Sequence, residues 1–230
     1  IACPDCGPRL DHDMGEIVEK IAAGAIVALK GIGGYQLICD ARNDAAVAAL
    51  RRRKDRDAKP FAVMAADAAA VEAFAAPTPR ERSLLESPQR PIVLIDSKQR
   101  LAPSVAPGLA RIGVMLPCAP VHHLLFHHAC RQGRDLALIA TSANAGGAPI
   151  LIEDADARRE LSGVADLIVG HDLPILARAD DSVMAVIEGA PAFLRRARGF
   201  APEPIDLGSD GPCVLALGGH LKTTVTLTRG

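Results

Sequence analysis

The sequence predicts an α/β fold, and three observations support this prediction. Short apolar runs that suit buried strands alternate along the chain with segments whose apolar residues recur at helical spacing. With 230 residues, 49% of them hydrophobic, the chain can bury one substantial core. Polar motifs at residues 30–35, 51–59 and 141–144 lie next to predicted strands. Open α/β sheets bind ligands at the ends of their strands, so these motifs also predict a site.

Each element is assigned from its apolar spacing and from the residues that stop it. Gly24 ends the first helix, because glycine readily adopts the conformation that closes a helix. Asn43 or Asp44 can cap the second helix, and Pro60 cannot continue a helix, so a strand follows it. The predicted helices are residues 14–23, 45–50, 67–74, 120–128 and 153–161, and the second carries the cationic run at its C-terminal end and beyond. The predicted strands are residues 25–29, 61–64, 91–95, 113–116, 136–140, 167–169, 178–186, 213–217 and 223–227, with a glycine turn at 218–219 between the last two.

Composition and charge argue against several classes of partner. The 26 basic and 27 acidic side chains give a net charge of −1, so no global field draws the molecule to nucleic acid or to an anionic membrane. One tyrosine and no tryptophan disfavour a base-stacking platform. There is neither an apolar run long enough to span a bilayer nor a signal segment at the start. We therefore expect a cytoplasmic protein with a local cationic site.

The six cysteines are scattered through the chain, which suits reduced thiols better than a disulfide framework. Cys3 and Cys6 form a Cys-x-x-Cys knuckle, but tetrahedral zinc needs four ligands and no second knuckle follows. The pair is therefore interpreted as half of a zinc site. Its other half would lie upstream in a longer parent protein; the alternative is that the two thiols are incidental.

The cationic run at residues 51–59 has six positive side chains in nine positions. Such charges repel one another unless solvent or a polyanion compensates them. Most charge runs are solvated helix faces, and the helix dipole stabilises cations at the end of a helix. The helix dipole does not explain Lys59. This residue is predicted to lie with Lys54 and Arg56 on the connection between the helix and the next strand. Together with the motifs at other strand ends, the run predicts an anion-binding site.

The histidine pairs and the Ser142–Asn144 motif can each be interpreted as a functional site or as ordinary structure. The histidine pairs in 122–128 place His123 and His127 one helical turn apart, as in some metal sites. No third ligand lies at a suitable spacing, so packed or surface histidines are favoured over metal. Ser142 and Asn144 arrive with glycines at the end of a predicted strand, although serine and asparagine also form common turns.

Taken together, these motifs resemble the YrdC-like family. The resemblance rests on Lys54-Asp55-Arg56 with Lys59-Pro60, Ser142-Ala143-Asn144, Asp181-Ser182-Val183 and Arg196. It covers nearly the whole chain, and it is closest to the branch of the family found in the carbamoyltransferases of nickel–iron hydrogenase maturation. The family fold is a twisted mixed α/β sheet around a large concave nucleotide-binding site, which agrees with the predicted elements.

The resemblance implies ATP-dependent formation of carbamoyl-adenylate from carbamate, which derives from carbamoyl phosphate. Nucleotidyl transfer is accelerated mainly by positioning and by neutralising charge, which is the work of cations. Mg²⁺ is expected to accompany ATP. The residues that the resemblance assigns to ATP and its phosphates are Lys54, Arg56, Lys59, Ser142, Asn144, Asp181, Ser182 and Arg196. Of these, Lys54, Arg56, Ser142 and Asn144 are the expected catalytic residues.

The carbamate is assigned to the glycine-rich motif. Members of the family that make threonylcarbamoyl-AMP for tRNA modification carry hydroxyl side chains there, and this chain carries a lysine and glycines. Backbone amides and a cation suit a small anion better than an amino acid. Lys30, Gly33, Gly34 and Tyr35 are therefore the expected carbamate-binding residues. A threonylcarbamoyl-AMP synthase, a secondary-metabolite O-carbamoyltransferase and a non-enzymatic RNA-binding module remain the alternatives.

The resemblance also implies a place in a longer chain. Residues 1–10 are expected to be the tail of a zinc-knuckle region, 11–202 the YrdC-like domain, and 203–230 a linker with the start of a downstream transferase domain. Zinc would be bound only in the intact parent protein. The implied partners are the other domains of the parent chain and the hydrogenase maturation protein whose C-terminal cysteine accepts the carbamoyl group.

Overall fold

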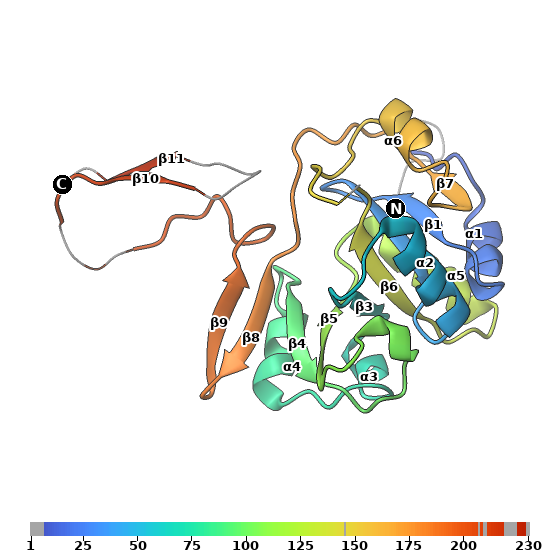
Figure 1. Cartoon of the computed structure of the whole chain (residues 1–230), viewed down its shortest axis with the longest axis horizontal. Coiled ribbons are helices and arrows are strands. Elements are labelled where there is room, and N and C mark those ends of the chain that lie inside the picture. Colours follow the sequence, from blue (N-terminus) through green and yellow to red (C-terminus); the bar gives the residue numbers. More distant parts are fainter. Residues whose placement is uncertain (1–6, 145, 207, 209–210, 219–224, 229–230) are drawn as a thin grey trace.

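The computed structural model describes residues 7–144, 146–206, 208, 211–218 and 225–228. Its centre is a nine-stranded sheet of mixed direction, and the predicted mixed α/β fold is confirmed. The strands are β1 (Val27–Lys30), β2 (Tyr35–Asp40), β3 (Ala62–Ala65), β4 (Ile92–Asp96), β5 (Arg111–Met115), β6 (Ala137–Ser142), β7 (Leu167–Val169), β8 (Val183–Ile187) and β9 (Ala190–Arg195). Their order across the sheet is β7-β1-β2-β6-β3-β5-β4-β8-β9 (Figure 1).

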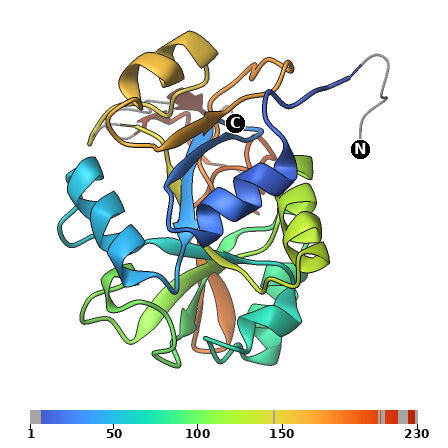
Figure 2. The ribbon, with the colours of Figure 1, turned by 90° about the vertical axis from the view of Figure 1, so that its right-hand side faces the viewer.

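Helices cover both faces of this sheet, which makes three layers. The helices are α1 (Met14–Ala22), α2 (Asp44–Lys54), α3 (Ala68–Val71), α4 (Pro79–Glu86), the 3₁₀ helix η1 (Pro103–Val105), α5 (Pro120–Arg131) and α6 (Asp154–Glu160). Apolar residues of α1 and α5 pack on one face, and these two helices lie side by side (Figure 2). Apolar residues of α2, α3 and α6 bury the opposite face. No described helix is long and apolar enough to cross a membrane.

Helix α2 carries the cationic run, as the sequence predicted, but it extends further than expected. The side chain of Asn43 accepts a hydrogen bond from the backbone N–H of Ala46, which confirms the predicted cap. The helix continues through the first part of the run to Lys54, where basic side chains interact favourably with the helix dipole. Asp55 ends the helix in the left-handed conformation, with φ of 49°.

Two strands of the large sheet were not predicted. β2 follows the glycine-rich motif directly, because Gly31 and Gly34 close a tight turn through a hydrogen bond of 3.0 Å and so return the chain alongside β1. β9 is an exposed edge strand, which tolerates the proline at position 191; that proline argues against a strand when the sequence is read alone. The helix predicted over 67–74 is shorter, since only Ala68–Val71 is helical and turns follow it.

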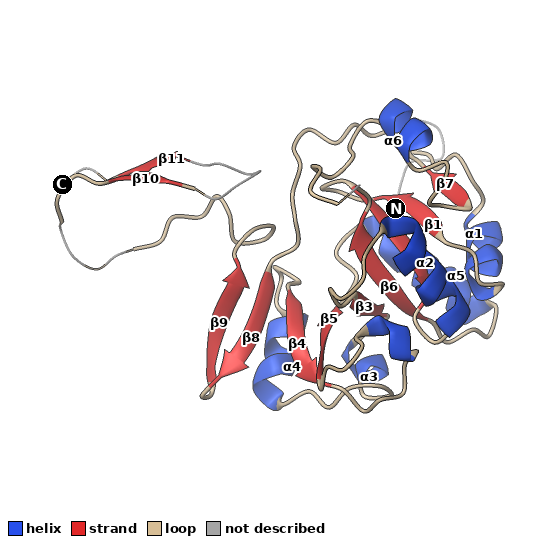
Figure 3. Cartoon of the chain, viewed as in Figure 1, coloured by secondary structure: helices blue, strands red, loops and turns tan. Residues whose placement is uncertain are grey.

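Two short strands stand outside the large sheet. β10 (Leu215–Leu217) and β11 (Val225–Leu227) pair with each other, which confirms the two strands predicted near the end of the chain. Figure 3 shows this hairpin in red, apart from the nine-stranded sheet. Residues 1–6, with Cys3 and Cys6, lie outside the described residues, as do residues 219–224.

Candidate functional site

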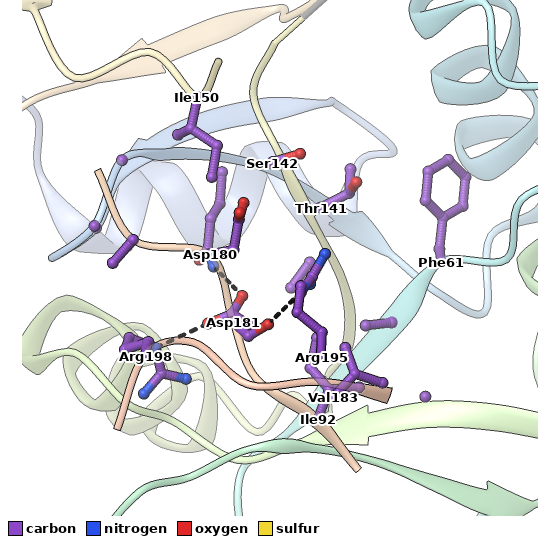
Figure 4. Close-up of a pocket in the computed structure, with 18 of the residues that line it drawn as sticks. Phe61, Ile92, Thr141, Ser142, Ile150, Asp180, Asp181, Val183, Arg195 and Arg198 are labelled. Carbon is purple, nitrogen blue, oxygen red and sulfur yellow. Dashed lines mark hydrogen bonds and ion pairs between the residues drawn. The ribbon is translucent and has the colours of Figure 1, made fainter. Parts of the chain in front are cut away.

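A pocket of about 370 Å³ lies on the face of the sheet that α5 covers, beyond the N-terminus of that helix (Figure 4). Its floor is made by small residues on three adjacent strands. Ala62 of β3 stands opposite Ala140 of β6 on one side and opposite Gly113 of β5 on the other. A Cβ on Gly113 would come within 2.9 Å of Ile92, so the floor has little room for larger side chains. The register of three small residues creates the hollow.

The cationic run supplies one wall of this pocket. Arg56 and Lys59 line it, together with Pro60 and Phe61, which lead into β3. Lys54 does not appear in the lining and lies just behind it. Its ammonium group donates hydrogen bonds to the backbone carbonyl oxygens of Ser142 and Asn144, at 2.6 and 2.8 Å. The predicted cationic connection and the predicted Ser142–Asn144 motif are therefore brought together.

Arg56 is held in place by its own loop. Its guanidinium donates to the carbonyl oxygens of Lys59 and Pro60 and lies over the ring of Phe61, 4.9 Å from its centroid. Arg51 lies 4.7 Å from the centroid of the same ring and donates to carbonyl oxygens on both sides of the loop, including those of Arg56 and Ser104. Arg51 thus fixes the backbone that presents the other cations.

The cations in this wall are partly buried and repel one another, and both effects lower their pKa values. Burial, followed by repulsion from Arg56 and Lys59, lowers the pKa of Lys54 to about 8. Burial and the charge of Arg51 lower the pKa of Arg56 to about 10. The pKa of Lys59 is lowered as well, first by burial and then by Arg56 and Arg195. A bound anion would relieve this repulsion.

Ser142 and Asn144 form a small polar network behind the cations. Ser142 lines the pocket, and its hydroxyl donates a 2.8 Å hydrogen bond to Oδ1 of Asn144. The same Oδ1 accepts from the ammonium of Lys54 at 3.0 Å, and Nδ2 of Asn144 donates to the carbonyl of Ala148. Asn144 itself does not appear in the lining, so it is placed to orient Lys54 and Ser142.

The glycine-rich motif forms the opposite wall. Gly33 and Gly34 both line the pocket. The carbonyl oxygen of Ala179 would lie 2.6 Å from a Cβ on Gly33, and Ile150 occupies the position that a Cβ on Gly34 would take. These glycines are therefore required by the close approach of neighbouring segments, and they leave backbone atoms beside the pocket.

Lys30 was expected to bind carbamate, but its ammonium group lies outside the pocket lining. Its ammonium is buried in an ion pair with Asp154 at 2.7 Å and donates to the carbonyl of His171. The hydroxyl of Tyr35 donates to the same Asp154 oxygen at 2.9 Å. Burial alone would raise the pKa of Asp154, but the hydrogen bonds from Lys30 and Tyr35 outweigh it and lower that pKa. Tyr35 lines the pocket, whereas Lys30 does not appear in the lining.

The segment that precedes β8, with Asp181, forms the third wall of the pocket. Asp181 lines the pocket, and its carboxylate forms an ion pair of 2.9 Å with Arg198. Figure 4 shows Asp181 between Arg195 and Arg198, and Arg195 donates to its backbone carbonyl. Ser182 is fully buried, and its hydroxyl donates to the carbonyl of Arg198. It therefore supports the wall from behind.

The cation expected at Arg196 is provided by its neighbours. Arg196 donates to the carbonyl of Glu203 and does not appear in the lining, whereas Arg195 and Arg198 line the pocket. The sequence shows the cluster, but which of its arginines line the pocket depends on the end of β9 at Arg195 and on the ion pair of Arg198 with Asp181. The floor residues Ala62, Gly113 and Ala140 also escaped prediction, because small apolar residues carry no chemical signal in a sequence.

The structure places both histidine pairs on helix α5. Within the described residues, no group of three or more His, Cys, Asp or Glu side chains could hold a metal ion. His123 and His127 are exposed on α5, and His122 beside them is buried.

Comparison with known proteins gives one family match. Residues 19–197 match the family model named for Sua5, YciO and YrdC and described as telomere recombination. Among curated relatives, the chain is 56% identical over 224 residues to a carbamoyltransferase HypF from Rhizobium leguminosarum bv. viciae, covering 96% of this chain and 30% of the relative. It is 35% identical over 223 residues to a probable carbamoyltransferase HypF from Methanocaldococcus jannaschii, covering 95% of this chain and 28% of the relative. The chain thus spans about a third of these relatives.

Solved structures agree with the sequence matches. A full-length HypF in a phosphate- and nucleotide-bound form superposes with a TM-score of 0.90 at 41% identity, covering 100% of this chain and 31% of that one. A P. abyssi Sua5 complexed with L-threonine superposes with a TM-score of 0.69 at 21% identity, covering 80% of this chain and 54% of that one. The second likeness concerns the fold alone.

Proposed function

This chain belongs to the Sua5/YciO/YrdC family, and on that basis and the geometry of its pocket we propose that it is the adenylate-forming part of a HypF-type carbamoyltransferase. In the proposed reaction a carbamate oxygen attacks the α-phosphorus of ATP. The bond between that oxygen and the phosphorus forms, the bond from the α-phosphorus to the bridging oxygen breaks, and pyrophosphate leaves. Carbamoyl-adenylate remains bound in the pocket.

One observation supports this proposal above the others. Three cations converge at one wall of the pocket, and within the described residues the hydrogen bonds of Lys54 and Arg56 go to uncharged oxygen atoms. Cations arranged in this way suit a ligand that brings its own negative charges, and a triphosphate does so. The similar full-length HypF binds phosphate and nucleotide, which supports the same conclusion.

Each of these residues has a role in the proposed reaction. Arg56 and Lys59 bind the β- and γ-phosphates and neutralise the charge that builds up on the leaving pyrophosphate. Lys54 lies behind this wall, where its ammonium donates to Ser142 and Asn144, and it contributes its positive charge to the site. Arg195, beside Asp181 in the third wall, replaces Arg196 as the fourth cation. The backbone of Gly33 and Gly34 leaves room for the carbamate.

Magnesium would accompany the triphosphate. It is usually held by one or two carboxylates together with phosphate oxygens and water, so it needs no cluster of protein ligands. Asp180 and Asp181 are carboxylates in the pocket lining that would contribute.

Pyrophosphate exchange into ATP tests the proposed reaction. With Mg²⁺, the chain should exchange labelled pyrophosphate when ammonium and bicarbonate supply carbamate, and it should not do so with L-threonine and bicarbonate. Threonine-dependent exchange would make it a threonylcarbamoyl-AMP synthase instead. Salt-sensitive retention of RNA without any exchange would favour the RNA-binding alternative.

We further propose that the chain performs only the middle step of the parent protein's activity. Hydrolysis of carbamoyl phosphate and transfer to a cysteine of the hydrogenase maturation partner are assigned to other domains, and residues 1–10 and 203–230 are the connections to them. A cysteine peptide incubated with the chain, ATP and carbamate should therefore show no thiocarbamate by mass spectrometry. Its appearance would overturn this division of labour.

A further inference from the structure

Two buried polar atoms in the pocket have no hydrogen-bond partner among the described residues. They are Oε1 of Gln36 and Nε2 of His122, and both residues line the pocket. A buried polar atom without a partner is costly, and native proteins contain few of them. Their occurrence together in the pocket indicates that a ligand supplies the missing partners.

Gln36 offers an acceptor. Its side chain belongs to β2, on the pocket side of the sheet, directly opposite Ser142 of β6. Nε2 of Gln36 donates to the carboxylate of Asp181 at 3.4 Å, which decides the orientation of the amide because a carboxylate can only accept. Oε1 is therefore an unused acceptor, and its complement is an N–H or O–H group.

His122 offers a donor. It is 2% exposed, in the first turn of α5, and Nδ1 accepts from the backbone N–H of Cys118 at 3.5 Å. Burial, together with the charge of Arg198, lowers its pKa to about 3, so the ring is neutral near pH 7. In a neutral ring whose Nδ1 accepts, Nε2 carries the proton. Nε2 is therefore a donor without an acceptor.

We propose that Gln36 and His122 recognise the carbamoyl group itself, Oε1 accepting from its NH₂ and Nε2–H donating to its carbonyl oxygen. This inference rests on the proposed function and deepens it. An amino group beside a carbonyl oxygen is the arrangement that one free acceptor and one free donor can satisfy together. Acetate has neither an N–H nor an O–H to offer, so this pair selects carbamate over acetate.

The edge of adenine also combines a donor and an acceptor, but the position of Gln36 favours the carbamoyl group. Gln36 pairs with Ser142, whose carbonyl binds the ammonium of Lys54. The free acceptor thus lies at the phosphate end of the pocket, close to Gly31 of the glycine-rich motif. In carbamoyl-adenylate the carbamoyl group is attached to the α-phosphate, and the adenine is at the other end of the molecule.

Two stable adenylate analogues test this recognition. Both carry a sulfamate in place of the phosphate; one is carbamoylated and the other acetylated, so that they differ only in NH₂ against CH₃. The wild-type chain should bind the carbamoyl analogue about ten- to a hundredfold more tightly by calorimetry, because the acetyl analogue leaves the Gln36 acceptor unpaired. Gln36→Met, which keeps the length but lacks the acceptor, should reduce this preference to about twofold or less. Gln132→Met, at the exposed C-cap of α5, is the control and should keep the full preference.

The outcomes separate this inference from the proposed function. If the wild-type chain binds both analogues equally well, the carbamoyl recognition is refuted while the nucleotide site stands. If it binds neither analogue, nor ATP, both the site and the inference fail. A Gln36→Met variant that discriminates as wild type does would overturn the role of Gln36.

His122 is tested with the same two ligands. His122→Phe should weaken both analogues by about tenfold, because both carry the carbonyl oxygen, and ATP should bind as before. His122→Gln, whose amide N–H can take the place of Nε2–H, should restore much of the affinity. Equal loss in both variants would overturn the role of His122, as would a loss confined to ATP.

Discussion

Lys54 donates to both oxygens that Asn144 can offer, the backbone carbonyl at 2.8 Å and Oδ1 at 3.0 Å. The two residues are 90 positions apart in the chain, and each was singled out from a separate motif. Their contact joins the helix that carries the cationic run to the loop after β6. A positive charge is thus held at a fixed position behind the pocket.

Loss of the cations at this wall should reduce nucleotide affinity without unfolding the protein. Arg56→Ala should weaken ATP binding by about ten- to a hundredfold, the usual effect of removing a charge-assisted contact worth about 1.5–3 kcal/mol. Lys54→Met removes a charge behind the wall and should weaken ATP binding less than Arg56→Ala does. Arg52→Ala, an exposed position in the same run, should bind ATP like the wild type. Calorimetric titration, with circular dichroism to verify folding, distinguishes a specific clamp from general loss of charge. Equal effects at Arg52 and Arg56 would contradict the clamp.

The affinity for ATP should depend on pH through Lys54. Its pKa of about 8 in the folded protein means that the ammonium form, which attracts phosphate, is lost as pH rises through 8. Wild-type affinity should therefore fall between pH 7 and 9.5, whereas Lys54→Met should show a much flatter profile. The folded pKa is lowered from 10.5, so the wild type should also gain stability relative to that variant between about pH 8 and 10.5. Parallel profiles in the two proteins would assign the titration elsewhere.

Asn144 and Ser142 should differ in their effects. Asn144→Ala removes an acceptor that serves Lys54 and Ser142 and a donor to Ala148, so both the melting temperature and ATP affinity should fall. Ser142→Ala removes one hydroxyl at the pocket and should reduce turnover with little change in melting temperature. Thermal shift and pyrophosphate exchange on the same samples make the comparison. If Ser142→Ala melts early and keeps full specific activity, the hydroxyl has only a structural role.

Filling the floor should block the pocket. Ala62→Leu adds bulk at the centre of the row formed with Gly113 and Ala140, so nucleotide binding should become undetectable. Ala62→Ser, which keeps the size, should retain binding and serves as the matched variant. Undiminished ATP affinity in a folded Ala62→Leu protein would show that the nucleotide binds elsewhere.

Lys30 should matter for stability more than for catalysis. Lys30→Met leaves Asp154 without its ion pair, and the folded state should lose about 1–3 kcal/mol as measured by urea unfolding. The Michaelis constant for carbamate should stay within about twofold of wild type. A selective rise in that constant, without loss of stability, would return Lys30 to the carbamate site that the sequence predicts.

Most elements of the fold could be predicted, because apolar spacing and stop signals are local. The cap at Asn43 and the break at Pro60 are examples. β2 was missed because the glycines before it also suit a ligand loop, and only pairing with β1 distinguishes the two. In the site, the charges of Lys54, Arg56 and Lys59 are visible in the sequence. The inward direction of Arg195 instead of Arg196, and the buried ion pair of Lys30, depend on register and on residues more than a hundred positions away.

The walls of the pocket are joined by contacts between distant parts of the chain. Gln36 and Asp181, which form a hydrogen bond, are 145 positions apart in the chain. The backbone N–H of Ala179 donates to the carbonyl oxygen of Gly33, which is similarly distant in the chain. Contacts that close such long loops form late, because the loss of chain entropy precedes any gain from the contact. During refolding, nucleotide binding should therefore appear with the slowest phase, after the central strands have formed. The same contacts can open first in the native state, so nucleotide binding should slow hydrogen exchange at Ala179 more than in β3 or β6.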